Sequence, residues 1–221
     1  MGIGKLGVIV QKTTTMKNYL LFIGIIIIFT GCQNLKKEKD SHDLICEKIE
    51  TELSSGVRND TIFLNFRFGM DRNEVSEHFK KLINEGRLTI NRPKYEYLFD
   101  FGENILPRIA KADLNVEYFD DKLYRLILYV TSDELISSPS LIHIHLASVF
   151  RDKYGYNYLK RPSVIDGKEA YVWIHGNMKI EVIAGIDDAR VFYTDLVAMK
   201  KKEKFDELKS AESKERILND I

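Results

Sequence analysis

Residues 114–131 read LNVEYFDDKLYRLILYVT, and their pattern predicts a β-hairpin. Apolar and polar side chains alternate over 114–119, and apolar or aromatic side chains fill most of 123–131. Both patterns are typical of strands. The Asp120-Asp121-Lys122 segment between them has the length of a tight turn, although the usual glycine is missing. The chain therefore contains an antiparallel strand pair.

A strand, a helix and a second strand are expected before this hairpin. Alternation over 62–68 predicts the first strand, and aromatic residues at every odd position over 95–101 predict the second. Asp71 and Glu74 have the spacing of a capping box, so a helix should begin after Asp71. Its buried face should carry Val75, Phe79 and Leu82.

The second half of the chain follows the same order. Serine and proline at 137–139 start a helix that runs to about Tyr154 and stops at Gly155. Three strands are then expected over 170–174, 178–183 and 190–194. In both halves a strand with an acidic residue, Glu117 or Glu181, leads to an Asp-Asp turn. We interpret residues 62–131 and 138–194 as a diverged tandem helix–strand–strand repeat, with coincidence as the alternative.

The predicted fold class is α+β, an antiparallel sheet with helices packed on one face. The globular domain is placed at 61–197. Residues 198–221 predict a charged C-terminal helix with a narrow apolar stripe. A solvated helix packed along one edge of the domain is favoured over a partner-binding coiled coil, which needs several clean heptads.

The N-terminal segment predicts a location. Lys17 precedes an apolar run over 19–29, which stops at Gly31-Cys32 and is too short to span a bilayer comfortably. This layout resembles the lipobox of bacterial lipoproteins. The resemblance implies a signal peptide over 1–31 and a diacylglycerol-bearing Cys32 that holds the protein to the lipid bilayer. A buried helix or an uncleaved anchor is the alternative.

Residues 32–60 are then expected to form the lipidated N-terminus and a tether with one short helix. Gln33 follows the cysteine where sorting in two-membrane bacteria tends to retain proteins carrying Asp. By that resemblance the expected location is the cell envelope, at the outer membrane.

Charge argues against a nucleic-acid partner. Loss of residues 1–31 removes three lysines and no acid, which leaves 30 basic and 33 acidic residues and a net charge of −3. Such a balance gives no general attraction for polyanions. Cys46 is then the only thiol apart from Cys32, so an internal disulfide is not expected.

Aromatic side chains are the candidate binding surface for a peptide or glycan. Tyrosines and a tryptophan alternate on predicted strands and after the second helix, and they bind a partner if one face of the sheet is uncovered. If helices cover that face, the same rings form core. The candidates are Tyr95, Tyr97, Tyr156, Tyr158 and Trp173.

No catalytic, metal or cofactor site is expected. His143 and His145 stand two apart on a predicted helix, so their rings point in opposite directions and do not share a metal. The acidic pairs Asp120-Asp121 and Asp187-Asp188 are interpreted as turn formers. The alternative is a cell-wall or glycan hydrolase that uses these turn carboxylates.

The segment FRFGMDRNEV, residues 66–75, resembles the opening of the SmpA/BamE family of outer-membrane lipoproteins. Those proteins have a strand, a Gly-Met turn with a polar cap, and a helix with valine one turn in. The resemblance implies a small α+β domain that serves as an accessory binding part of an envelope assembly. The expected function is therefore a non-catalytic binding or assembly role, with an envelope protein or polymer as partner.

Overall fold

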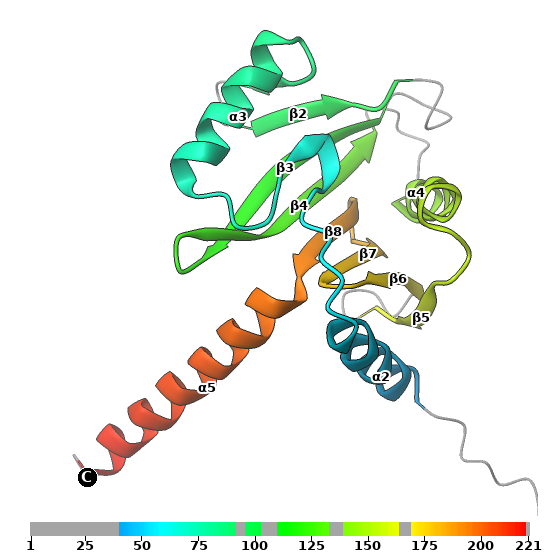
Figure 1. Ribbon diagram of the computed structural model, residues 1–221. Helices are drawn as coiled ribbons and strands as arrows, with labels where there is room; N and C mark the ends of the chain where they lie inside the picture. The colour runs from blue at the N-terminus through cyan, green and yellow to red at the C-terminus, as the bar shows by residue number, and fades with distance from the viewer. Residues whose placement is uncertain (1–39, 92–95, 103–109, 133–138, 164–168, 220–221) are drawn as a thin grey trace, which may run out of the picture. The chain divides into compact units, whose positions relative to one another are not determined.

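The computed structural model describes residues 40–91, 96–102, 110–132, 139–163 and 169–219, which belong to one compact unit, Asp40–Ile221. Within this part of the chain, eight antiparallel strands form one sheet in the order β1-β2-β3-β4-β8-β7-β6-β5 (Figure 1). The strands are β1 (Thr89–Asn91), β2 (Glu96–Asp100), β3 (Ala110–Phe119), β4 (Lys122–Ser132), β5 (Leu159–Pro162), β6 (Glu169–His175), β7 (Met178–Ala184) and β8 (Ala189–Asp195).

Four helices of the described residues accompany the sheet, so the predicted α+β class is confirmed. They are α2 (Ser41–Ser54), α3 (Arg72–Asn84), α4 (Pro139–Tyr154) and α5 (Leu196–Asn219), together with the short 3₁₀ turn η1 (Phe63–Asn65).

The sheet consists of two halves with the same order of elements. Helix α3 precedes β1 to β4, and helix α4 precedes β5 to β8. The halves meet where β4 pairs with β8 through six residue pairs, from Arg125 opposite Thr194 to Val130 opposite Ala189. The expected repeats, 62–131 and 138–194, fall on these two halves. Their common origin stays a prediction.

Helices α3 and α4 cover one face of the sheet, and the core lies beneath them. On α3, Val75 and Phe79 are buried while Arg72 and Lys80 are exposed, as the spacing of the apolar residues predicts. The two helices contribute Val75, Phe79 and Leu82 from α3 and Ile142, Leu146 and Phe150 from α4. The capping box at the start of α3 is also confirmed: the Asp71 side chain accepts from the Glu74 N–H at 2.9 Å, and Glu74 accepts from the Asp71 N–H at 2.8 Å.

Helix α2 packs on the opposite face of the sheet. Its residue Ile45 forms a second, smaller core with Val172 and Ile174 of β6 and with Leu196 at the start of α5. Successive strand residues point to opposite faces, so Trp173 of β6 belongs to the core beneath α4 while its neighbours belong to the core beneath α2. The compact unit therefore begins at Asp40, and the expected tether is packed structure from that residue onward.

The β3–β4 hairpin forms as predicted, and its turn explains the missing glycine. Asp120 and Asp121 both adopt left-handed backbone angles, with φ of 52° and 55°. A two-residue hairpin turn needs this conformation, and aspartate tolerates it better than most other residues.

The strand predicted over 62–68 is wrong. Leu64 and Asn65 adopt left-handed angles and reverse the chain, so the Ile62 N–H donates to the Phe66 carbonyl at 2.8 Å. The alternation instead reflects burial of Phe66 and Phe68 in the main core from a tight loop. The predicted strands at 95–101, 170–174, 178–183 and 190–194 correspond to β2, β6, β7 and β8, with Tyr95 outside the described residues.

Candidate functional site

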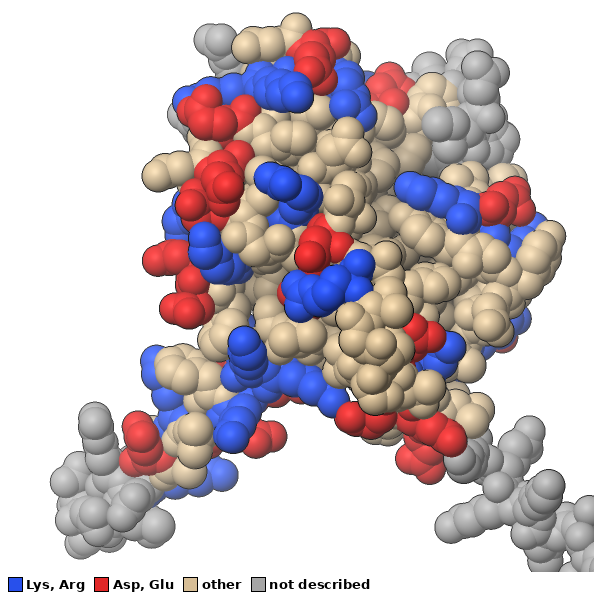
Figure 2. All heavy atoms as spheres, viewed as in Figure 1, with Lys and Arg blue, Asp and Glu red and all other residues tan. Residues whose placement is uncertain are grey.

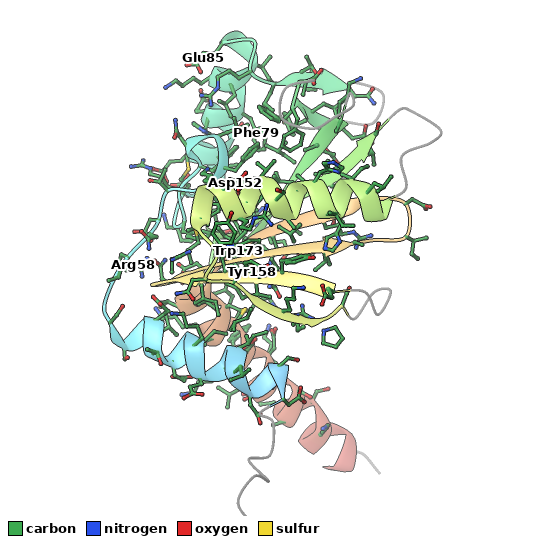
Figure 3. All side chains as sticks on the ribbon, turned by 90° about the vertical axis from the view of Figure 1, so that its right-hand side faces the viewer. Arg58, Phe79, Glu85, Asp152, Tyr158 and Trp173 are labelled. Carbon is green, nitrogen blue, oxygen red and sulfur yellow. The ribbon has the colours of Figure 1, made fainter. Side chains whose placement is uncertain are left out.

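The aromatic residues proposed as a binding surface do not form one exposed surface. Trp173 is fully buried, and its indole N–H donates to the Gly155 carbonyl at 2.9 Å. Tyr158 packs beside it with ring centroids 5.4 Å apart (Figure 3). Tyr156 is 74% exposed, with the Arg151 guanidinium 5.1 Å from its ring centre. Of the three, Tyr156 alone is open to a large partner.

Tyr97 lies in the other half of the sheet. Its ring stacks on Phe79 of α3 at 4.0 Å between centroids. Tyr95 lies outside the described residues. The helices thus cover the face to which Tyr97, Tyr158 and Trp173 point, and these rings serve mainly as core.

The two Asp-Asp turns lie at opposite ends of the sheet. Asp121 precedes Lys122 at the start of β4, whereas the 185–188 turn precedes Ala189, which pairs with Val130 near the end of β4. Eight residue steps along a strand span roughly 25 Å. Asp121 is bound by Arg72 at 3.0 Å and Asp188 by Arg190 at 3.0 Å. Paired carboxylates for glycoside hydrolysis lie within about 10 Å, so these turns do not form such a pair.

The histidines of α4 point apart, as their helical spacing predicts. His143 is buried with Nε2 3.3 Å from the Val182 carbonyl, and His145 is exposed with Nδ1 2.8 Å from the Leu141 carbonyl. Among the residues that the structure describes, no three His, Cys, Asp or Glu side chains come together as metal ligands.

A groove between α2, α5 and the sheet is a candidate site whose lining residues all belong to the described part of the chain. It has a volume of about 420 Å³ and is lined by charged, polar and apolar side chains. One wall carries His42, Ile45, Cys46, Ile49 and Glu50 of α2; the other carries Met199, Lys200 and Glu203 of α5; the floor carries Arg161, Lys179 and Glu181. Lys200 of α5 forms an ion pair with Glu50 of α2 and so links the two walls.

Glu181 is the centre of the groove floor. Its carboxylate accepts from Arg161 Nη2 at 2.9 Å and lies 2.8 Å from Lys179 Nζ. Lys179 and Glu181 are two residues apart on β7 and therefore share a face, whereas Arg161 reaches across β6 from β5. The residue of β6 opposite Arg161 is Ala170, whose small side chain leaves room for the guanidinium.

The electrostatics of this triad favour the ionised carboxylate. Burial acts to raise the pKa of Glu181, but Lys179 and Arg161 outweigh it, and the pKa lies below its ordinary value of 4.5. The side chain of Glu181 is 12% exposed and that of Lys179 is 14% exposed. The triad therefore places two cations and one anion, all with largely buried side chains, in the floor of the groove.

The β6–β7 turn fixes the α2 wall of the groove. The Gly176 N–H donates to the Glu52 carboxylate at 2.8 Å, and the Asn59 N–H donates to Asn177 Oδ1 at 2.6 Å. Lys48 and the Gly176 N–H lower the pKa of Glu52. A Cβ on Gly176 would lie 2.3 Å from the Val57 carbonyl oxygen, so this close approach needs glycine.

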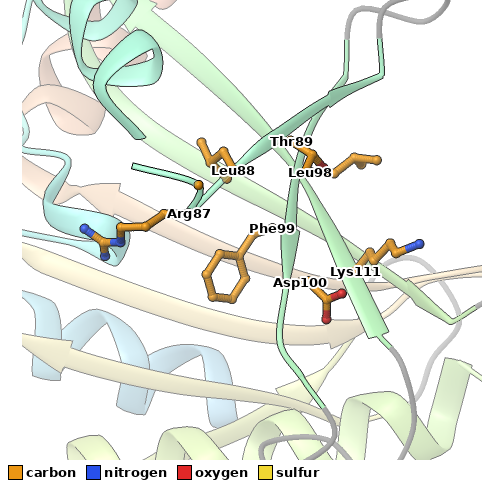
Figure 4. A pocket seen from close by; sticks show the side chains of 8 residues that line it. Arg87, Leu88, Thr89, Leu98, Phe99, Asp100 and Lys111 are labelled. Atoms are coloured by element: carbon orange, nitrogen blue, oxygen red, sulfur yellow. The ribbon is translucent and has the colours of Figure 1, made fainter. Parts of the chain in front are cut away.

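A second cavity, of about 410 Å³, lies at the edge of the first half of the sheet (Figure 4). It is lined by Gly86, Arg87, Leu88, Thr89, Leu98, Phe99, Asp100 and Lys111. Asp100 and Lys111 are register partners on β2 and β3. Residues 92–95 and 103–109, which join these strands, lie outside the described residues, so the α2–α5 groove is the more completely described of the two sites.

No protein-family model, curated protein or solved structure matches this chain. Within the described residues, no helix is long and apolar enough to cross a membrane. The evidence for a binding site therefore comes from the residues that line the groove and not from similarity to another protein. Sequence reasoning noticed Glu181 as a repeated acidic position but missed its partners Arg161 and Lys179.

We predict that Glu181→Gln destabilises the domain by about 3 kcal/mol at neutral pH, because it leaves two desolvated cations without their carboxylate. A carboxyl group with a lowered pKa stabilises the folded state above its unfolded pKa, and this contribution is lost as pH falls through the folded pKa. The difference between wild type and variant should thus shrink below pH 4.5.

Urea unfolding across this pH range measures the effect. Glu77→Gln is the matched control, because Glu77 pairs with Lys80 on the exposed surface of α3, where solvent screens the pair and its loss should leave stability nearly unchanged. If Glu181→Gln does not lower the free energy of unfolding, or lowers it equally at neutral and acidic pH, then the ionised Glu181 carboxylate does not stabilise the triad as proposed.

Proposed function

We propose that this chain is a lipid-anchored lipoprotein of the cell envelope with a non-catalytic binding or assembly role. The basic residue Lys17, the apolar run 19–29 and the Gly31-Cys32 ending support the anchor. The α2–α5 groove supports the binding role, and it is the observation that carries this part of the proposal.

The compact domain follows the proposed anchor closely. Seven residues separate Cys32 from Asp40, the first residue of the compact unit. A fully extended chain covers at most about 3.6 Å per residue, so Asp40 stays within about 30 Å of an acylated Cys32. Residues 41–54 of the expected tether form helix α2, which packs on the sheet. The proposal therefore places the groove near the membrane surface.

The groove suits a polar partner with mixed charge. Carboxylates of Glu50 and Glu203 and the ammonium of Lys200 lie on its walls, and Ile45, Ile49 and Met199 offer apolar contact. A segment of polypeptide carries both kinds of group, and protein interfaces combine an apolar centre with a polar rim. An envelope protein is thus the partner class that we favour over a uniformly charged polymer.

The structure of residues 66–75 fits the SmpA/BamE pattern in its glycine turn and its capped helix, and this resemblance supports the proposed role. Gly69 has a φ of 83° and precedes the capped helix α3, but the segment before it is a loop and not a strand. By that resemblance we propose an outer-membrane location. A hydrolase remains the alternative function, but the roughly 25 Å between the Asp-Asp turns favours binding.

The anchor is tested by the mass of the N-terminal peptide from protein extracted from membranes. We predict a first residue Cys32 that carries a diacylglyceryl group, and a Cys32→Ala variant that is neither cleaved at this site nor lipidated. Cys46→Ala is the matched control, because it removes the other cysteine and should be processed normally. A mature N-terminus at a residue other than Cys32 would refute the lipoprotein.

The binding role is tested with a photo-reactive amino acid in place of Glu203 on the groove wall. We predict a discrete crosslinked product in intact cells, which Cys46→Trp should abolish by filling the groove. The same photo-reactive residue in place of Glu77, on exposed α3, should give no such product. Equal products at both positions, or no effect of Cys46→Trp, would count against the groove.

A further inference from the structure

Helix α5 is held by its first turns and is exposed beyond them. Leu196 is fully buried and Met199 is partly buried against α2 and β6. Every residue from Glu203 to Lys214 is exposed, and Figure 1 shows the helix running away from the sheet. Phe205 is 45% exposed and Leu208 is 57% exposed. Two large apolar side chains thus face solvent on a projecting helix.

Charges separate around this part of α5. Successive residues of an α-helix are turned by about 100°. Lys201, Lys204, Phe205, Leu208 and Lys209 consequently fall on one side, which we name the basic face. Within 201–209, the acidic residues Glu203, Asp206 and Glu207 fall on the other side, where Glu203 lines the groove. Glu212 falls in line with Lys201 and Phe205, so the basic face ends before it. Figure 2 shows Lys and Arg side chains gathered where α5 leaves the sheet.

The apolar residues of the basic face are framed by lysines. Lys209 Nζ lies 4.6 Å from the centre of the Phe205 ring, and Phe205 contacts Phe119 of the β3–β4 hairpin at 6.0 Å between ring centroids. A helix with Phe and Leu between Lys side chains is typical of segments that lie on a membrane surface.

The start of α5 packs beside α2, which is the first helix after the proposed anchor in the sequence. His42, Cys46 and Glu50 of α2 face Met199, Lys200 and Glu203 of α5 across the groove. Beyond this contact, α5 runs away from α2 (Figure 1). Helix α2 begins at Ser41, and the segment between Cys32 and Asp40 precedes it in the sequence. That preceding segment, residues 33–39, itself carries Lys36, Lys37 and Lys39 and a single acid.

We propose that the basic face of α5 binds the surface of an anionic phospholipid bilayer and orients the anchored domain on it. This inference rests on the proposed lipid anchor, which keeps the bilayer within about 30 Å of Asp40. Charge complementarity favours this occupant, because the lysines attract anionic headgroups while Phe205 and Leu208 enter the interface. Between Glu203 and Lys214, a paired helix from a second copy would have only Phe205 and Leu208 as large apolar residues to bury, too few for a stable coiled coil.

Vesicle binding of residues 40–221 tests the proposal without the anchor, because this fragment holds both cores and all described strands but lacks Cys32. We expect binding to vesicles of phosphatidylcholine and phosphatidylglycerol in equal parts, little binding to phosphatidylcholine alone, and weakening by salt. With roughly 1 kcal/mol for each lysine near an anionic surface, Lys201→Glu, Lys204→Glu and Lys209→Glu together should weaken binding about 100-fold or more.

The matched control reverses three basic residues of α3 and the following turn, Lys80→Glu, Lys81→Glu and Arg87→Glu, with the same change in net charge. It should retain most of the binding. Phe205→Ser with Leu208→Ser should also weaken binding. Because Phe205 packs on Phe119 and both side chains are only about half exposed, the melting midpoint should fall slightly and the domain should stay folded.

Three results would overturn the proposal. They are equal binding to both kinds of vesicle, equal losses in the α5 and α3 triple variants, and self-association in sedimentation velocity that Phe205→Ser and Leu208→Ser abolish. Failure of the anchor would appear separately, as an unmodified Cys32 in a protein whose 40–221 fragment still binds anionic vesicles.

Discussion

The pairing of β4 with β8 is the constraint on which the rest of the structure depends. It joins two four-stranded halves into one sheet, and its residues Leu126, Leu128, Val191 and Tyr193 lie at the centre of the main core with at most 1% exposure. Each fully buried side chain of this kind stabilises the fold by about 1.5–3 kcal/mol. Without this pairing, α3 and α4 would cover two small separate sheets.

The α2–α5 groove also depends on the β4–β8 pairing, because its residues are attached to the half of the sheet formed by β5 to β8. Strand β8 holds β7 in register, β7 carries Lys179 and Glu181, and the end of β8 continues directly into α5. The turn between β6 and β7 fixes α2 through Glu52 and fixes the segment after α2 through Asn59. Both walls and the floor of the groove are therefore attached to one half of the sheet. The proposed membrane contact of α5 extends from the same point.

Local signals in the sequence were sufficient for the helices, the β3–β4 hairpin and the fold class. The Asp71 cap and the Val75, Phe79 and Leu82 spacing are properties of neighbouring residues, and the structure confirms them. Edge strands β1 and β5 were missed because they are three and four residues long and largely polar. Alternation was misleading at 62–68, where a left-handed turn at Leu64 and Asn65 buries the same phenylalanines from a loop.

The candidate site could not be predicted because its parts are far apart in the chain. Cys46, Arg161, Glu181 and Glu203 meet only after the sheet order is known. Trp173 was placed on one face of a strand by the alternation of side chains, and it was then proposed as a surface residue. Only the packing of α4 shows that this face is covered and that Trp173 is buried.

Hydrogen–deuterium exchange at increasing denaturant shows whether the β4–β8 pairing holds the two halves together, because it reports the opening of each strand. We expect the paired segments 126–130 of β4 and 190–193 of β8 to be the most protected and to lose protection together. Loss of protection in β4 at a clearly lower denaturant concentration than in β8 would show two halves that open independently. That result would contradict a single sheet held together by this pairing.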